Sequence, residues 1–233
     1  MIKINKIIPT ALLITSISSP VLADNWNVGL SASVATIDGT ARDTQVNNAG
    51  TVVAQTRGAT GGDATFPFGS VFLEYAKTID KDLDIIFGLD YVPFKAEIES
   101  KSFSDSSIEA ATAATEGVRK AKLELENYAT LYLQPTYKIG GGTAVFGKVG
   151  YIHGDVKISG SNTATGSTIN ATDTLNGYIV GLGVQHNINK NVFVRLEGSF
   201  TAHDDVTATD SLGTKFTADS ELIAGKLSIG YSF

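Results

Sequence analysis

The feature that most constrains the fold of this chain is a two-residue alternation of apolar side chains with polar or small ones. In the first such stretch, Trp26, Val28, Leu30, Ala32 and Val34 alternate with Asn27, Gly29, Ser31 and Ser33. Successive side chains of a β-strand point to opposite faces, so this period predicts strands with one apolar and one polar face. The alternation recurs seven times, within residues 69–76, 83–91, 123–134, 145–152, 177–185, 192–200 and 223–233.

The lengths of the strands and of their connections predict how they are arranged. Each stretch has about nine residues or more, the length that a tilted strand needs to cross a membrane. Short turns rich in Gly, Asn, Asp and Lys alternate with long polar connections. The turns fall at residues 78–82, 139–142 and 187–191, and the long connections at 37–67, 95–121, 155–173 and 204–219. This layout predicts an all-β fold, an eight-stranded antiparallel up-and-down barrel that crosses a membrane, with short periplasmic turns and long extracellular loops.

The first 23 residues have the features of an export signal. Lys3 and Lys6 give a positive start, residues 7–17 form a short apolar segment, and small residues precede a cleavage position after Ala23. The apolar run is too short for a membrane anchor, and Pro9 interrupts it. We therefore expect a cleaved signal peptide over residues 1–23 and one barrel domain over residues 24–233.

Composition excludes several classes of protein. No stretch of eighteen consecutive apolar residues exists, which argues against a helical membrane span. The absence of cysteine excludes disulfides, thiolate metal sites and a lipidated cysteine. A net charge of -6 argues against a nucleic-acid partner. No phosphate loop, zinc-ligand spacing or dinucleotide fingerprint occurs, so we expect no cofactor and no bound metal.

The direction in which each face points is a separate question, because a soluble lipocalin-like barrel also has eight alternating strands. The composition of the small face favours a membrane barrel, since glycines share that face with Glu, Asp, Lys and Arg. These glycines are Gly29, Gly88, Gly150, Gly154, Gly177, Gly181, Gly183 and Gly230. Eight strands enclose a space just wide enough for side chains, so this face fits a narrow polar lumen. The apolar face then meets lipid, with aromatic residues at both interfaces.

Strand parity places nine ionisable side chains in the predicted lumen. They are Glu74, Asp84, Asp90, Glu124, Glu126, Lys148, Arg195, Glu197 and Lys226. Charges inside a membrane-embedded barrel are costly unless paired or hydrated, so we expect each cation to have carboxylate neighbours. Counted from the short turns, Arg195 and Glu74 lie low, whereas Glu124 and Glu126 lie near the outer rim. Such a network predicts a plugged lumen, with a switchable pore as the alternative.

The C-terminal half of the chain carries a family resemblance. The last residues, KLSIGYSF at 226–233, end in Phe after apolar or aromatic residues at alternate positions, namely Leu227, Ile229, Tyr231 and Phe233. This ending resembles the assembly signal of outer-membrane proteins, which implies recognition by the barrel assembly machinery. GYIVGLGV at 177–184, NKNVFVRLE at 189–197 and FGKVGY at 146–151 are similar to strands of small OmpA-like and opacity-like surface barrels. The sequence lacks the peptidoglycan-binding domain of full-length OmpA proteins, so we expect no cell-wall tether.

The resemblance implies a function at the cell surface. It suggests a structural outer-membrane barrel with polar loops, contributing to envelope integrity and surface contact. The alternatives are a narrow channel for ions or small apolar solutes, gated by the lumen ion pairs, and an adhesin or immune-evasion protein. We expect a monomer surrounded by outer-membrane lipid and lipopolysaccharide. Arg119, Lys120 and Lys122 cluster at the predicted outer rim, where they could contact lipopolysaccharide phosphates or form a solvated loop base.

The three histidines test whether the chain is an enzyme. A barrel resembling the lipid A deacylases would need a Ser two positions after a His, and none of His153, His186 and His203 has one. His203 precedes Asp204 and Asp205, residue types that omptin-like proteases use, but that family has ten strands. A loop-edge His beside Asp rarely has the geometry of a general base. We therefore expect no enzymatic activity.

Overall fold

The computed structural model of the chain describes residues 24–44, 57–58, 62–107, 115–163, 166–211 and 215–233; the predicted signal peptide over residues 1–23 lies outside the described residues. The strands are β1 (Asn25–Thr44), β2 (Arg57–Gly58), β3 (Gly62–Asp80), β4 (Leu83–Tyr91), β5 (Ala96–Ser107), β6 (Thr115–Gly140), β7 (Thr143–Asn162), β8 (Ser167–Asn187), β9 (Val192–His203), β10 (Val206–Thr209) and β11 (Lys215–Ser232). Among these residues, no helix is long and apolar enough to cross a membrane.

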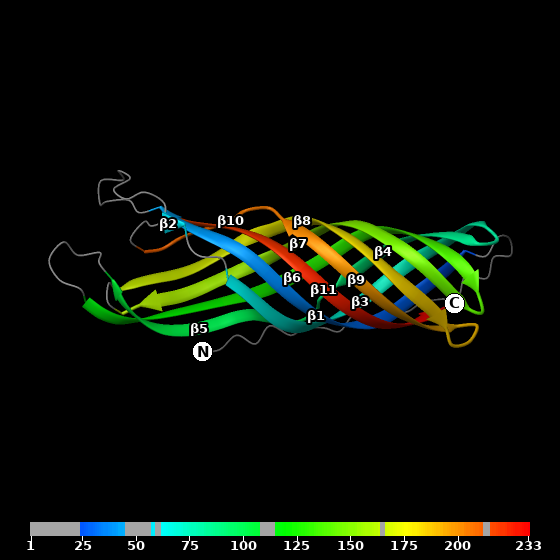
Figure 1. The fold of residues 1–233 in the computed structure, drawn as a ribbon, viewed down its shortest axis with the longest axis horizontal. Helices are drawn as coiled ribbons and strands as arrows, with labels where there is room; N and C mark the ends of the chain where they lie inside the picture. Colours follow the sequence, from blue (N-terminus) through cyan, green and yellow to red (C-terminus); the bar gives the residue numbers. More distant parts are fainter. Residues whose placement is uncertain (1–23, 45–56, 59–61, 108–114, 164–165, 212–214) are drawn as a thin grey trace, which may run out of the picture.

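Eight of the strands close into an antiparallel barrel (Figure 1). Around the ring they follow the order β1, β3, β4, β6, β7, β8, β9 and β11, and β11 pairs with β1 to complete it. The remaining three segments extend this ring: β5 follows β4 and pairs with β6, β10 follows β9 and pairs with β11, and β2 pairs with the end of β1. The predicted antiparallel β-barrel is therefore confirmed, with eight strands in the closed ring and three additional strand segments.

The short turns join the strands at one end of the barrel, which we call the turn end. They cover residues 81–82, 141–142 and 188–191, in agreement with the sequence. At the second turn, Gly140, Gly141 and Gly142 have φ angles of 96°, 62° and 75°. Side chains with a Cβ rarely adopt these values, so glycine is needed there. We call the opposite end of the barrel the mouth end.

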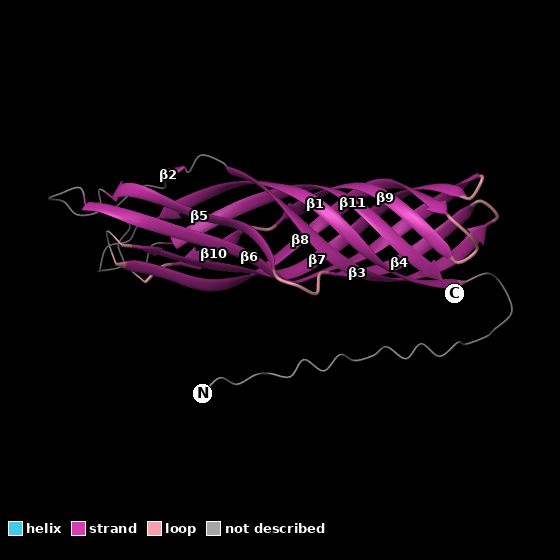
Figure 2. Ribbon diagram, turned by 90° about the horizontal axis from the view of Figure 1, so that it is seen from below, coloured by secondary structure: helices cyan, strands magenta, loops and turns pink. Residues whose placement is uncertain are grey.

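The strands run much further toward the mouth end than the sequence analysis predicted (Figure 2). Residues 37–67, 95–121, 155–173 and 204–219 were expected to be long loops, and most of their described residues belong to strands. β1 continues to Thr44, β7 continues to Asn162, and β8 begins at Ser167. The Thr-rich composition of these segments is compatible with strands, because β-branched side chains fit a pleated surface.

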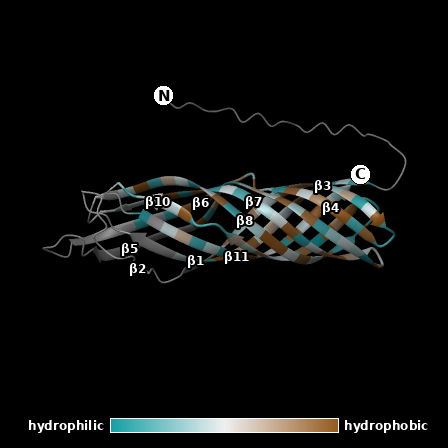
Figure 3. Cartoon of the chain, turned by 90° about the horizontal axis from the view of Figure 1, so that it is seen from above, coloured by the Kyte–Doolittle hydropathy of each residue, from teal (hydrophilic) through white to brown (hydrophobic). Residues whose placement is uncertain are grey.

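In the half of the barrel nearer the turn end, the apolar face points outward and the polar face inward. Leu30, Leu131 and Leu182 are 61%, 65% and 74% exposed on the outer surface, whereas Glu74 and Arg195 are buried inside. Apolar and polar residues alternate along the strands of this half (Figure 3). This arrangement is that of a membrane barrel, and it has the sidedness that the glycine-and-ion face predicts.

Nearer the mouth end, the sidedness is reversed. A buried apolar cluster fills the interior, and we call it the apolar plug. Its larger members are Phe66, Val92, Leu125, Tyr128, Ile152, Val156, Leu175, Ile179, Val206 and Leu222. The outer surface at this level carries exposed polar side chains, including Thr36, Asp38, Thr65, Glu97, Thr172, Thr174 and Glu221. This part has the polarity of a soluble barrel, so the chain uses both arrangements in series along one axis.

A β-bulge in β6 switches which residues point inward. The register against β7 shifts between Glu126 and Ala129, and Asn127 has a φ of 52°. One inserted residue reverses the facing of every residue on its mouth side. Leu125 therefore points into the plug, and Glu124 and Glu126 point outward. The predicted lumen positions of these two glutamates are wrong for this reason.

The bulge gives a direct prediction. We expect Asn127→Ile to lower the free energy of unfolding by about 1–2 kcal/mol, because a β-branched residue is strained in the left-handed region. Asn127→Gly should be nearly neutral, although it removes the 2.8 Å hydrogen bond from Asn127 Nδ2 to Asp155 Oδ2. Urea titration in detergent micelles measures the free energy of unfolding of both variants. The Asp155→Ala variant measures the contribution of the Asn127–Asp155 hydrogen bond alone. Equal stability of the Ile and Gly variants would contradict the strain argument.

Candidate functional site

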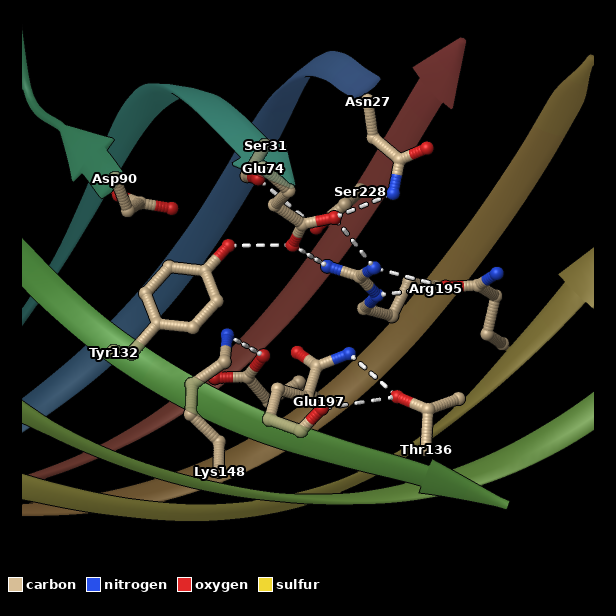
Figure 4. A network of polar contacts seen from close by, with 12 residues as sticks. Asn27, Ser31, Glu74, Asp90, Tyr132, Thr136, Lys148, Arg195, Glu197 and Ser228 are labelled. Atoms are coloured by element: carbon tan, nitrogen blue, oxygen red, sulfur yellow. Dashed lines mark hydrogen bonds and ion pairs between the residues drawn. The ribbon is translucent and has the colours of Figure 1, made fainter. Parts of the chain in front are cut away.

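The most distinctive polar site is a pair of buried salt bridges in the lumen, which we call the ion layer (Figure 4). It consists of Glu74 from β3, Lys148 from β7, and Arg195 and Glu197 from β9. Arg195 and Glu197 are alternate residues of one strand, so both point into the lumen. All four residues are at most 5% exposed.

The Glu74–Arg195 pair has bidentate geometry. Arg195 Nη1 lies 2.7 Å from Glu74 Oε1, and Arg195 Nη2 lies 3.1 Å from Glu74 Oε2. Asn27 Nδ2 donates to Glu74 Oε2 at 3.1 Å, and the Tyr132 hydroxyl donates to Glu74 Oε1 at 2.5 Å. Arg195 also donates to Gln185 Oε1, at 2.8 Å from Nη2. Two buried charges are stable together only when their remaining hydrogen-bonding positions are filled, and these contacts do so.

The Lys148–Glu197 pair lies beside the first one and is connected to it through Tyr132. Lys148 Nζ donates a hydrogen bond to Glu197 Oε2. The same ammonium group lies 4.3 Å from the centre of the Tyr132 ring, within the range of a cation–π contact. Since the hydroxyl of Tyr132 binds Glu74, one aromatic side chain contacts both salt bridges.

Two further salt bridges involve predicted lumen residues. Lys226 Nζ lies 2.9 Å from Asp90 Oδ2, and both side chains are largely buried. Asp84 lies near the turn end, where its Oδ1 is 2.7 Å from Lys138 Nζ. The structure thus gives each of Lys148, Arg195 and Lys226 a carboxylate partner.

Of the other predicted charged residues, Lys120, Lys122, Glu124 and Glu126 lie on the outer surface near the mouth end. Lys95 Nζ is 2.6 Å from Glu126 Oε1, and this hydrogen bond raises the pKa of Lys95. Lys122 Nζ lies 2.9 Å from Glu124 and 3.2 Å from Glu97. Lys120 is exposed. Arg119 belongs to β6, and its side chain lies outside the described residues. Lys122 is therefore already paired with two carboxylates, and a lipopolysaccharide phosphate would have to compete with them.

The predicted assembly signal forms part of the membrane-facing surface. Leu227, Ile229, Tyr231 and Phe233 are 60%, 52%, 48% and 42% exposed on the outside of β11 and at its end. The backbone of Phe233 makes two hydrogen bonds with Trp26, of 3.0 and 3.1 Å, which close the ring at the turn end. The aromatic side chain is thus free to be recognised while the backbone completes the barrel.

Deletion of Phe233 should separate these two roles. We expect several-fold less folded protein in the outer membrane of cells, but normal refolding of the purified variant in detergent. The physical reason is that folding loses only two terminal hydrogen bonds, whereas the assembly machinery loses the aromatic group that the family resemblance implies it reads. Unboiled gels measure both yields, and Phe233→Tyr is the matched control. Unchanged yield in cells would contradict the predicted signal.

Four lumen aromatic rings each cover a glycine on the neighbouring strand. The pairs are Phe72 over Gly29, Tyr132 over Gly88, Phe146 over Gly183 and Phe193 over Gly230, and each is a direct cross-strand pair. Three of these rings surround the Arg195 guanidinium, at 5.1–5.6 Å from its central carbon. The glycines therefore provide the room in which the rings, and with them the ion layer, are packed.

Sequence reasoning missed two groups of residues. The neutral partners of the ion layer, Asn27, Tyr132 and Gln185, point inward by parity, but nothing in the sequence indicated their contacts. The apolar plug was missed because apolar residues were assigned to lipid. For Ile152 and Ile179 the sequence does indicate an inward-facing position, since each lies on the strand face that also holds lumen glycines.

The histidine that suggested protease chemistry points into the barrel. The His203 ring lies 3.3 Å from Ser220 Oγ and 3.5 Å from the Tyr128 hydroxyl. Asp204 and Asp205 are exposed. Across the described part of the chain, no group of three or more His, Asp or Glu side chains could hold a metal ion.

Comparisons with known proteins agree with this architecture. Residues 10–232 match the family described as the outer membrane protein beta-barrel domain. The outer membrane protease OmpT from Escherichia coli aligns with 11% identity over 93% of this chain and 99% of its own, at a TM-score of 0.50. OprG from Pseudomonas aeruginosa aligns with 16% identity over 91% of this chain and 97% of its own, at a TM-score of 0.49. The attachment invasion locus protein Ail of Yersinia pestis aligns with 14% identity over 87% of this chain and 98% of its own, at a TM-score of 0.40. No curated protein matches the chain. At these identities, the structural likeness extends to the fold alone.

Proposed function

Because the chain belongs to the outer membrane protein beta-barrel family and lies in the outer membrane, we propose that it is a sealed structural barrel without enzymatic activity. In this role it supports the integrity of the envelope and presents a polar surface outside the cell. The observation that carries the proposal is the filling of the lumen. Side chains occupy it at two levels, as salt bridges in the ion layer and as packed apolar residues in the plug.

The parts of the strands near the mouth end support the proposed polar surface outside the cell. Above the membrane-type section, the strands continue as a barrel with an apolar interior and polar exterior. Burial of apolar side chains stabilises such a structure in water, so the strands can project beyond the lipid surface. A rigid, polar extension of this kind suits contact between the cell surface and its surroundings.

A gated pore is the second candidate. Arg195 and Glu197 are two residues apart on β9, and their partners Glu74 and Lys148 both contact Tyr132. Two neighbouring salt bridges of this kind could exchange partners without leaving a charge unpaired. An exchange that shifted these side chains toward the wall would open the ion layer.

Conductance measurements test the proposed function against the second candidate. Pure protein refolded in detergent and inserted into planar bilayers should give no stable conductance steps, whereas a general porin serves as the positive control. Stable steps that change in Lys148→Met or Glu197→Gln would overturn the sealed barrel and favour the pore. Refolding is checked by the shift of unboiled protein on gels.

The envelope and surface roles need tests in cells. A strain without the protein should become more sensitive to detergent, and the wild-type gene should restore resistance. Cells that carry a variant with shortened loops should resist detergent but adhere less to host-cell or abiotic surfaces if an adhesin role is added to the structural one. Unchanged detergent sensitivity of the deletion strain would contradict the envelope role.

A further inference from the structure

A layer of small hydroxyl side chains separates the ion layer from the apolar plug. Along β9, Glu197 of the ion layer is followed by the inward-facing Ser199 and Thr201. Along β1, Ser33 is the inward-facing residue next to the plug residue Ala35, with the outward-facing Val34 between them. Along β3, Ser70 lies between the plug residue Phe66 and Glu74 of the ion layer. We call Ser33, Ser70, Ser199 and Thr201 the hydroxyl layer.

Polar atoms in and beside the hydroxyl layer have no protein partner. Ser33 Oγ and Ser70 Oγ of the layer and Glu197 Oε1 of the adjoining ion layer lack a hydrogen bond within the described part of the chain. Their residues are buried, at 3%, 4% and 2% exposure. Buried polar groups in native proteins are nearly always hydrogen-bonded, either to protein or to ordered water. These atoms therefore indicate hydrogen-bond partners that are not part of the chain.

The residues at this level are small. Ser and Thr are the smallest hydroxyl side chains, and Gly181 of β8 is the direct cross-strand partner of Ser199. A Cβ atom on Gly181 would lie 3.3 Å from the Gly198 carbonyl oxygen, 3.4 Å from Glu197 Oε1 and 3.5 Å from Ser199 Cβ, so a larger residue there would crowd the free carboxylate oxygen.

The charges at this level favour a neutral ligand. Glu197 is paired with Lys148, and the nearby Asp90 is paired with Lys226. Each pair is neutral as a whole, so the layer has no excess charge to attract an ion. Hydroxyl groups and a carboxylate oxygen together offer donors and acceptors, as water requires.

We propose that the hydroxyl layer holds water molecules in a chamber closed by two seals, the ion layer on the periplasmic side and the apolar plug on the extracellular side. This inference rests on the proposed function in that both layers must seal the lumen. It adds that the seals act in series. Opening the ion layer alone would connect the chamber to the periplasm but not to the outside.

Water-edited solid-state NMR on the full mature protein in lipid bilayers tests the chamber. Magnetisation transfer from water should build up early at Ser33 and Ser70, and late at the plug residues Ile152 and Leu222. Ser70→Val, which fills part of the layer, should weaken the transfer at Ser33. Ser31→Ala is the matched control, because the Ser31 hydroxyl already has Ser228 Oγ at 2.9 Å. Late transfer at the hydroxyl layer, or equally early transfer at the plug, would overturn the proposal.

Conductance of three variants tests the series arrangement. Lys148→Ser with Glu197→Ser removes one of the two salt bridges of the ion layer, Ile152→Ser with Leu222→Ser removes two large side chains of the plug, and a third variant combines all four changes. We expect conductance only from the combined variant, with folding of each confirmed by gel shift and by its NMR spectrum. A conducting ion-layer variant would show that the plug is no seal. Conductance of the wild-type protein would instead refute the proposed function, so the two failures are distinguishable.

Discussion

Arg195→Leu is expected to lower the free energy of unfolding by about 3–5 kcal/mol, the range for removing one partner of a buried ion pair. The variant leaves the Glu74 carboxylate fully buried with only Asn27 and Tyr132 as hydrogen-bond donors. It also removes the guanidinium from among Phe72, Phe146 and Phe193, where leucine fills only part of the space. A urea titration followed by the gel shift of folded protein measures the change.

The double variant separates charge from packing. Combining Arg195→Leu with Glu74→Gln removes the unpaired charge and should recover a large part of the lost stability, because replacing both partners of a buried pair is often nearly neutral. Lys81→Leu is the control for a salt bridge in water, since Lys81 and Asp82 are 83% and 42% exposed and their pair should contribute little. A double variant no more stable than Arg195→Leu would mean that packing around the guanidinium, rather than charge, dominates.

Gly183→Val should cause the second large effect and lower the fraction of protein that folds. A Cβ atom at Gly183 would overlap sterically with both the Phe146 ring and the Leu196 carbonyl oxygen, because it would lie much closer to them than van der Waals contact allows. A ring can rotate away, but the carbonyl is held in the ladder between β8 and β9, so the strands would have to separate. We expect a loss of about 3 kcal/mol or more, at the upper end of the cost of overpacking.

Gly198→Val provides a matched control for this prediction. Gly198 lies on the neighbouring strand β9 and faces outward, and a Cβ atom there would meet nothing within 4 Å. Valine is a good strand residue on a lipid-facing surface, so this variant should fold like the wild type. The folded fraction after refolding into micelles compares the two. Equal folding of both variants would contradict the assignment of Gly183 to a tightly packed lumen.

Much of the membrane section could be predicted from the sequence. The alternation from Trp26 to Val34 is a local property, and it correctly separates exposed from buried residues along β1. The same parity put Glu74, Lys148, Arg195 and Glu197 inside, where the cost of unpaired charge already required partners. Which carboxylate binds which cation depended on the strand register, which no local pattern fixes.

The bulge in β6 shows where parity fails. The alternation of residues 123–133 looks continuous, and only the polar Asn127 within the apolar series hints at an interruption. The extra residue is defined by the pairing of β6 with β7, because two strands must be compared to count it. Glu124 and Glu126 were therefore assigned to the wrong face, along with Leu125.

The local alternation of side chains is enough to show that this chain forms two-faced strands, since it follows from the geometry of an extended backbone. It could not determine which face turns inward at each height. That choice depends on the surrounding solvent, because apolar side chains turn outward in lipid and inward in water. Only the closed ring, with β11 paired to β1, sets the height of every residue and thereby shows where the membrane-type section ends and the apolar plug begins.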